Sequence, residues 1–327
     1  MNKIIKNILL FSFTGILLWF SLKDLKLEKL KEAWQDTDIL LLTFTSILAI
    51  LSHVIRAERW KLMLSPIGYK TSVVRNFYAV MIGYFVNLAI PRGGELSRCV
   101  SLKETDDVPV QVSLGTVVAE RVVDLFFMLL LLGVTLLVEF EKIMLIITDM
   151  YRLMGKMIKT IPSYYVYLII VGVLAICGIL FYLYRRGSFD ALFSKGKNFL
   201  IGIKQGMSSL FKLEKMGLFI IYSVLIWILY YSMTYFGMKA FPSTSHLTIL
   251  AALTLFAASG IAMTIPLPGG AGSYHTIIPA VLLLYSVSST DGAYFATIFH
   301  LWQTLTIIAI GSICLILGQI KSKNATS

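Results

Sequence analysis

The sequence predicts an all-α polytopic membrane protein with about six transmembrane helices and two oppositely oriented re-entrant helical hairpins, arranged as an inverted repeat. Composition predicts the class, because 57% of the residues are hydrophobic and the mean hydropathy is +0.80. Soluble domains contain fewer apolar residues. Several apolar runs reach about 18 residues, which is long enough to cross roughly 30 Å of hydrocarbon.

The longest apolar runs predict the membrane crossings. The first run follows Lys3 and Lys6 and is not closed by a small-residue cleavage site, so we interpret it as a retained helix. The crossings are expected near residues 4–22, 38–57, 108–138, 163–184, 216–240 and 291–318.

Basic residues predict the topology. The chain has 29 Lys and Arg against 18 Asp and Glu, a net charge of +11, and loops 56–75 and 185–215 are rich in Lys and Arg. Cytoplasmic loops carry such an excess. We therefore place both loops and both termini in the cytoplasm of a multi-pass protein in the bacterial plasma (inner) membrane. The charge then reflects topology, and no nucleic-acid partner is expected.

Two regions, 76–105 and 248–288, are interrupted by Pro and Gly. Because two crossings separate the two basic loops, region 76–105 must return the chain to the side that it left. Region 248–288 must likewise begin and end outside. Each is predicted as a re-entrant hairpin, with its tip at 91–95 or 266–272. The alternative is that both Pro/Gly clusters are ordinary loops between short helices.

The two halves follow the same order of crossing, crossing, hairpin and crossing. An odd number of crossings makes the halves inverted copies, as in alternating-access carriers. The predicted division is a first membrane repeat over 1–138, an external connector over 139–162, a second repeat over 163–320 and a cytoplasmic tail over 321–327.

Several ionisable residues fall within the predicted membrane segments, where an unpaired charge is costly. Glu120 and Asp124 are four residues apart and share a helix face, and Arg121 reaches a neighbouring element. We expect them to form one cluster of three Arg and three carboxylates with the first tip, which supplies Arg92, Glu95 and Arg98. The cluster either fixes the hairpin to the bundle or leaves Arg92 or Arg98 free for a lipid phosphate, which guanidinium groups bind bidentately.

Glycines at both tips allow backbone N–H groups to approach an anion closely, although a tight hairpin needs them in any case. The candidates that complete the substrate site are Gly93, Gly94, Pro268, Gly269, Gly270 and Gly272.

His275 and His300, together with Glu95 and Asp124, are candidates for a proton path that drives transport. The alternative is that each His only finds a local hydrogen-bond partner. The three Cys form no CxxC pair, and no catalytic motif such as HExxH or GxSxG is present. We therefore expect no metal, no cofactor and no catalytic residue.

Several motifs occur together along the chain: Gly83-Tyr84-Phe85-Val86-Asn87-Leu88-Ala89-Ile90-Pro91, Gly94-Glu95-Leu96-Ser97-Arg98, Glu120-Arg121, Asp124 and Pro266-Leu267-Pro268-Gly269-Gly270-Ala271-Gly272. Taken together, these motifs resemble the lysylphosphatidylglycerol synthase transmembrane region family, also called flippase-like domain proteins. In the best-known relatives this domain precedes a soluble aminoacyl-transferase domain and is credited with flipping the aminoacylated lipid.

The chain ends at Ser327 directly after its last predicted helix, so a free-standing membrane domain without the transferase is expected. Lipid aminoacylation by this chain alone is therefore not expected. The chain departs from the family pattern at position 275, where it has His and many relatives carry an acidic residue.

The resemblance and the broken segments together predict a lipid transporter, which moves a phospholipid or lipid-linked headgroup between leaflets by alternating access. One alternative is a membrane-embedded transferase that acts on a lipid or polyprenyl phosphate, with Glu95 or Asp124 as general base. Another is a scaffold that recruits a separately encoded synthase. The sequence leaves the oligomeric state open.

Overall fold

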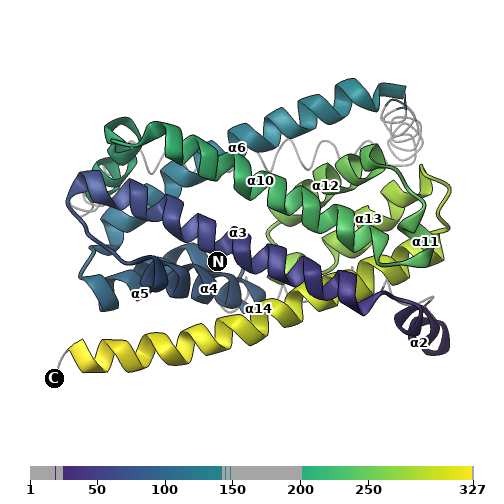
Figure 1. Ribbon diagram of the computed structural model, residues 1–327, viewed down its shortest axis with the longest axis horizontal. Helices are drawn as coiled ribbons and strands as arrows, with labels where there is room; N and C mark the ends of the chain where they lie inside the picture. Colours follow the sequence, from purple (N-terminus) through teal and green to yellow (C-terminus); the bar gives the residue numbers. More distant parts are fainter. Residues whose placement is uncertain (1–18, 20–24, 142–143, 145–147, 149–200, 326–327) are drawn as a thin grey trace, which may run out of the picture.

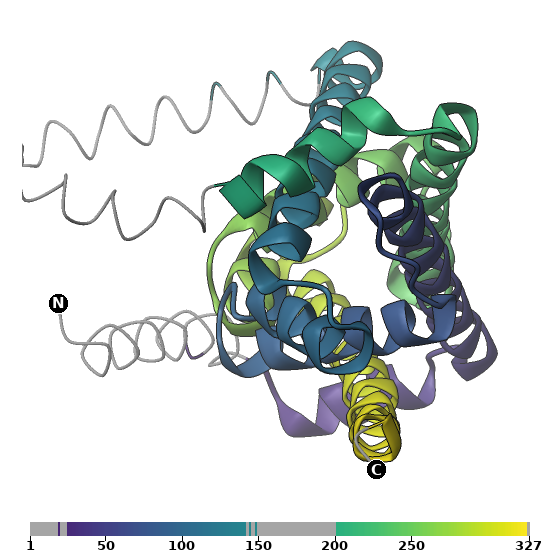
Figure 2. The ribbon, with the colours of Figure 1, turned by 90° about the vertical axis from the view of Figure 1, so that its left-hand side faces the viewer.

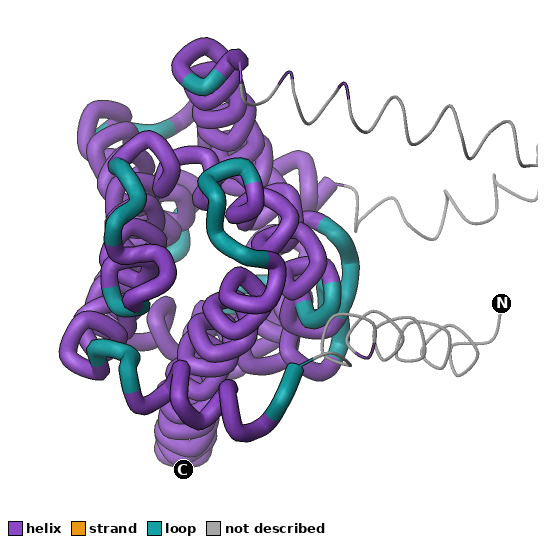
Figure 3. The backbone as a smooth tube through the Cα atoms, turned by 90° about the vertical axis from the view of Figure 1, so that its right-hand side faces the viewer, coloured by secondary structure: helices purple, strands orange, loops and turns teal. Residues whose placement is uncertain are grey.

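The structure, a computed structural model, describes residues 19, 25–141, 144, 148 and 201–325. Over these residues it is helical and contains no strand (Figure 3). Among these described residues, four helices are long and apolar enough to cross a membrane: Ile39–Ile67, Val110–Val138, Met216–Lys239 and Ser289–Gly318.

The long helices are α3 (Ile39–Leu64), α6 (Val110–Val138), α10 (Met216–Lys239) and α14 (Ser289–Ala325). They correspond to the crossings predicted at 38–57, 108–138, 216–240 and 291–318. The crossings predicted at 4–22 and 163–184 and most of the connector 139–162 lie outside the described residues. In Figure 1, α3 and α14 run from right to left, whereas α6 and α10 run from left to right.

Short elements connect the long helices. The described part contains α2 (Leu27–Gln35), η1 (Ser65–Ile67), α4 (Val73–Ala89), α5 (Gly94–Asp106), η2 (Ser209–Lys212), α11 (Pro242–Ser245), α12 (Ile249–Thr264), η3 (Pro268–Gly270) and α13 (Ser273–Leu283). The order of long helix, hairpin and long helix therefore occurs twice. The inverted-repeat relation and the division into domains stay predictions.

The first Pro/Gly cluster separates α4 from α5. Pro91 disfavours the helical conformation at Ile90, whose backbone is extended (φ −123°, ψ 103°). The two helices then pack antiparallel and very closely: a Cβ atom on Gly94 would lie 2.1 Å from the carbonyl oxygen of Gly83. The backbone N–H of Gly94 donates to Asn87 Oδ1 at 2.7 Å. This segment is a helical hairpin.

The second Pro/Gly cluster separates α12 from α13. Ser273 Oγ donates to the carbonyl of Ala262 at 2.9 Å, next to the turn. At the open end, the Tyr285 hydroxyl donates to Thr254 Oγ1 at 2.8 Å. Gly269, Gly270 and Gly272 all have positive φ, which L-residues with a Cβ atom rarely adopt. Glycine at these positions makes the tight turn of this second hairpin possible.

The two hairpin tips contact one another. Arg92 Nη2 donates to the carbonyl oxygen of Thr264 at 2.9 Å, and a Cβ atom on Gly269 would lie 3.1 Å from Leu88 Cδ2. We call this the tip contact. In Figure 1, α4 and α5 occupy the left half and α12 and α13 the right half. The hairpins therefore approach each other from opposite ends of the molecule.

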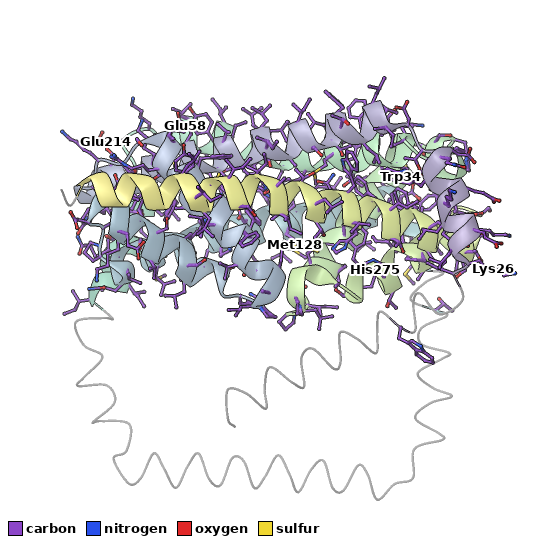
Figure 4. The ribbon with its side chains drawn as sticks, turned by 90° about the horizontal axis from the view of Figure 1, so that it is seen from below. Lys26, Trp34, Glu58, Met128, Glu214 and His275 are labelled. Carbon is purple, nitrogen blue, oxygen red and sulfur yellow. The ribbon has the colours of Figure 1, made fainter. Side chains whose placement is uncertain are left out.

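The long axis of the bundle, horizontal in Figure 1, separates its two polar ends. Figure 4 shows Glu58 and Glu214 at one end and Lys26 and Trp34 at the other, with α14 crossing between them.

Hydrogen bonds from side chains join α14 to α3. For example, Trp302 Nε1 donates to the carbonyl of Leu42 at 2.9 Å. Such bonds between membrane helices are each worth on the order of 1 kcal/mol.

Helix α3 is longer than the sequence predicts. The predicted crossing ends near residue 57, where Arg56 and Arg59 were assigned to a cytoplasmic loop. That assignment is wrong, because both residues lie inside α3 and are buried. Hydropathy treats each Arg as an exposed charge, whereas here carboxylates on α6 neutralise both guanidinium groups.

Gly94→Ala should destabilise the protein by about 1–3 kcal/mol, because the new methyl group would overlap the backbone of α4. Unfolding of the detergent-solubilised protein measures the change. Gly217→Ala is the matched control, since nothing lies within 4 Å of its Cβ position. Equal stability of the two variants would contradict the close packing of the hairpin.

Candidate functional site

Glu120 lies at the centre of the charged residues and its side chain is fully buried. Its Oε1 accepts hydrogen bonds from Arg56 Nη1 and from Arg59 Nη2, the latter at 3.0 Å. Its Oε2 accepts from Arg98 Nη2 at 2.8 Å. One carboxylate therefore joins two arginines of α3 to the first hairpin through α6.

Asp124 lies one helical turn beyond Glu120 and contacts the same two arginines. Its Oδ2 accepts from Arg56 Nη1 at 2.9 Å and its Oδ1 from Arg59 Nη2 at 2.8 Å. Spacings of three residues on α3 and four on α6 place each pair on one helix face. We call the connected set the ion network: Arg56, Arg59, Arg98, Arg121, Glu95, Glu120 and Asp124.

Aromatic and hydroxyl groups surround the three buried arginines, Arg56, Arg59 and Arg98, which we call the inner arginines. The Arg98 guanidinium lies 4.7 Å from the centroid of the Trp60 ring. Arg59 Nη1 donates to Ser223 Oγ at 3.1 Å, and Arg56 Nη2 donates to the Tyr230 hydroxyl at 3.2 Å. Figure 2 shows the helices that supply these residues arranged around a common axis. The inner arginines are thus fixed on several sides and shielded from water.

Arg121 differs from the inner arginines, because its side chain is 45% exposed against the described part of the chain. Its ion pairs are also longer, at 3.5 Å to Glu95 Oε1 and 3.5 Å to Asp124 Oδ2. Among the described residues, Glu95 Oε2 is buried and has no hydrogen-bond partner. Arg121 and Glu95 form the loosely held rim of the network.

The structure brings together five of the six residues predicted as one cluster, and Arg92 lies apart from them. Arg92 is at the tip, where its guanidinium contacts the second hairpin through Thr264. Its backbone has φ 61°, a left-handed conformation that is unusual for Arg. Arg98, a predicted candidate for phosphate binding, is instead buried against Trp60 and Glu120.

The second tip carries the two candidate histidines. His300 Nε2 donates to the carbonyl of Gly269 at 3.0 Å, and the ring stacks on Tyr274 at 5.0 Å between centroids. The His275 ring lies 5.0 Å from that of His300, and Figure 4 shows His275 beside α14. These contacts form a group of their own, whereas Glu95 and Asp124 make theirs within the ion network.

Sequence reasoning missed Arg56, Arg59 and His53. His53 lies on α3 with its ring 4.3 Å from that of Tyr84, and the Tyr84 hydroxyl is 3.4 Å from that of Tyr230. The sequence feature that could have identified them is the spacing of three residues between positions 53, 56 and 59, which keeps these side chains on neighbouring faces of one helix. Over the described residues, no group of three or more His, Cys, Asp or Glu is placed to hold a metal.

The family model of the lysylphosphatidylglycerol synthase transmembrane region matches residues 5–311, almost the whole chain. The chain belongs to the lysylphosphatidylglycerol synthase transmembrane region family. The resemblance noted in the motifs is therefore confirmed. With four candidate spans in the described part of the chain, the protein is a multi-pass membrane protein.

One relative is the UPF0104 membrane protein MJ1595 of Methanocaldococcus jannaschii, which is 30% identical over 146 residues. The alignment covers 42% of this chain and 44% of the relative, so it spans less than half of that protein. No solved structure matches the chain.

Glu120→Gln should lower the free energy of unfolding by about 3–5 kcal/mol, because it leaves the buried Arg98 without a carboxylate and leaves Arg59 with Asp124 alone. Arg121→Gln should cost less than about 1 kcal/mol, since that side chain is half-exposed and its pairs are long. Denaturant unfolding in detergent measures both. Similar losses for the two variants would contradict the distinction between the inner network and its rim.

Proposed function

We propose that this protein carries a phospholipid or lipid-linked headgroup between the leaflets of a membrane. The observation that carries the proposal is the meeting of two helical hairpins, from opposite ends of the bundle, at their tips. Broken helices at corresponding places in two halves are typical of alternating-access transporters, whose substrate sites lie near the bilayer midplane.

The lengths of the hairpin helices support re-entrance. Helix α5 has 13 residues and α13 has 11, which corresponds to about 20 Å and 17 Å of helix. Both are shorter than the roughly 30 Å of a hydrocarbon core. In the proposal each hairpin enters the membrane, turns near the midplane and returns, with the long axis of Figure 1 along the membrane normal.

Arg121 is the proposed phosphate contact. Its 3.5 Å pairs with Glu95 and Asp124 are longer than good charge-assisted bonds, which measure about 2.7–2.9 Å. A phosphate could therefore replace a weak interaction rather than a strong one. Gly93 and Gly94 add no backbone donor to this contact, because their N–H groups already donate to the Ile90 carbonyl at 2.9 Å and to Asn87 Oδ1 at 2.7 Å. The inner arginines position α3, α5 and α6 around this rim.

The tip contact is the proposed gate. Arg92 donates to a neutral carbonyl at the end of α12, whereas a phosphate would offer its guanidinium two charged oxygens in a bidentate pair. A headgroup that reaches Arg92 would thus favour separation of the tips. Pro268, Gly269, Gly270 and Gly272 form the opposing surface, and His275 and His300 are the proposed coupling residues beside it.

The alternative is a membrane-embedded transferase, and Glu95 is the residue that favours it. Asp124 is engaged by two inner arginines and is a poor general base, whereas Glu95 Oε2 is free of hydrogen bonds among the described residues. Glu95 next to a bound phosphate could accept a proton. A covalently altered lipid made by the pure protein would favour this alternative.

Arg121→Gln should abolish movement of fluorescent phospholipids between the leaflets of reconstituted liposomes, because the rim loses its exposed guanidinium. Arg121→Lys should retain part of the rate, since it keeps the charge without the bidentate geometry. Quenching of the outer-leaflet probe measures the rate.

Arg75→Gln is the matched control for that assay. Arg75 is 38% exposed and pairs with Asp106 at the open end of the first hairpin, away from the ion network. Its loss should leave the rate unchanged. An unaltered rate in Arg121→Gln would reject the phosphate contact, and no movement by folded wild-type protein across several headgroups would reject the transporter.

Arg92→Gln should increase the distance between the tips, because the tip contact loses its charged donor. Spin labels at Ile90→Cys and Met263→Cys, both exposed positions, in a background without the three native Cys, report this distance by electron paramagnetic resonance. The same label pair with Arg75→Gln is the control. An identical distance distribution with and without Arg92 would show that the contact does not join the hairpins.

A further inference from the structure

Helix α5 has one face that the described part of the chain leaves uncovered. Its inner face carries Arg98, Cys99 and Leu102, which are buried. On the outer face, Leu96 and Val100 lie one turn apart and are 53% and 39% exposed. An apolar stripe of this kind needs a nonpolar neighbour.

The outer face borders a groove. The groove has a volume of about 480 Å³ and runs between the first hairpin and the C-terminal half of α14, where Leu315 and Gly318 close it. Helix α14 packs on both α4 and α5, and Figure 1 shows it running along them. The volume falls within the range of about 300–1,000 Å³ that is common for ligand sites.

Small residues keep the groove open. Ser97 and Ser101 on α5 line it, together with Gly93 just before the helix, at spacings of four residues, so they form one row. The Ser97 hydroxyl already donates to the carbonyl of Gly94 at 3.1 Å, so it needs no further partner. The row therefore offers space beside the apolar stripe rather than a set of unsatisfied polar groups.

The length of the groove matches one leaflet. Its lining extends along α5 from Gly93 at the tip to Thr105 near the open end of the hairpin. Twelve residues of helix rise about 18 Å, and half of a hydrocarbon core is about 15 Å. A single acyl chain of one leaflet therefore fits along the groove.

The charge of the groove indicates the headgroup. Among the lining residues that the structure describes, Glu104 is the one that carries a charge, and it lies at the open end of the hairpin, beside Ser101 and Thr105. A carboxylate at this place favours a cationic amine and disfavours a purely anionic headgroup. The apolar remainder of the lining, towards the tip, suits hydrocarbon.

We propose that this groove is a loading site for one acyl chain of a zwitterionic, amine-bearing phospholipid. The headgroup lies at Glu104 and the end of the chain lies near the first tip. The proposal rests on the transport function proposed above, to which it adds the substrate class and the place where the lipid enters. Only α5 then separates the bound chain from the ion network.

Photolabelling in proteoliposomes tests the site. The probe is phosphatidylethanolamine with a diazirine near the end of one acyl chain, and mass spectrometry maps the labelled residues. Labelling of the groove residues on α5 and α14 should exceed several-fold that of Ile221 and Ile228, which are exposed on α10. The α10 residues report ordinary contact with bulk lipid. Groove labelling no higher than theirs would overturn the proposal.

Two variants separate chain binding from headgroup recognition. Ser101→Leu should fill the groove and reduce its labelling to the α10 level, whereas Thr43→Leu, which places the same side chain on an exposed face of α3, should not. A phosphatidylglycerol probe should label the groove less than phosphatidylethanolamine, and Glu104→Gln should remove that difference. Equal labelling by the two probes in the wild type would overturn the headgroup assignment.

The outcomes distinguish the loading site from transport itself. Groove labelling in protein that moves no fluorescent lipid would contradict the transport function and leave the groove as a lipid-binding site. Translocation that persists while the groove is labelled no more than α10 would contradict the loading site alone. Labelling that survives in Ser101→Leu would place the chain elsewhere.

Discussion

The structure depends on the buried carboxylate of Glu120. Transfer of charges out of water costs several kcal/mol per ion, and only well-placed partners offset that cost. Glu120 meets this condition with guanidinium groups from α3 and α5 at both of its oxygens. Because it can do so in one arrangement, the network fixes how α3, α5 and α6 lie relative to one another. We infer that the network specifies this arrangement more than it adds to net stability.

The arrangement of these three helices also determines where the tip of the first hairpin lies. With Arg98 fixed on α5, the hairpin tip that begins this helix is fixed as well, and Arg92 is held opposite α12. The contact between the two tips is weak by comparison, since it consists of one charge-assisted bond to a carbonyl and of van der Waals packing around Gly269. A weak contact at the tips would let the tips separate while the packing of α3 on α10 and of α4 on α14 still joins the two halves.

Helix α5 divides two environments. Its inner face supplies Glu95 and Arg98 to the ion network, and its outer face supplies Leu96 and Val100 to an apolar groove. A lipid has the same division between a charged head and an apolar chain. One helix therefore presents suitable surfaces for both parts on its two faces, and a headgroup could move along the rim while its chain stays in hydrocarbon.

The sequence by itself determined the class, the family, the long helices and the positions where both hairpins break, because hydropathy, Pro and Gly act locally. It also indicated that Glu120 and Asp124 need cationic partners. Only the tertiary structure decided which partners those are. Arg56 and Arg59 look like the start of a basic loop when hydropathy is summed along the chain, and they become buried because carboxylates more than 60 residues away neutralise them. The same dependence on distant contacts separated Arg92 from the ion network and placed it against the second hairpin.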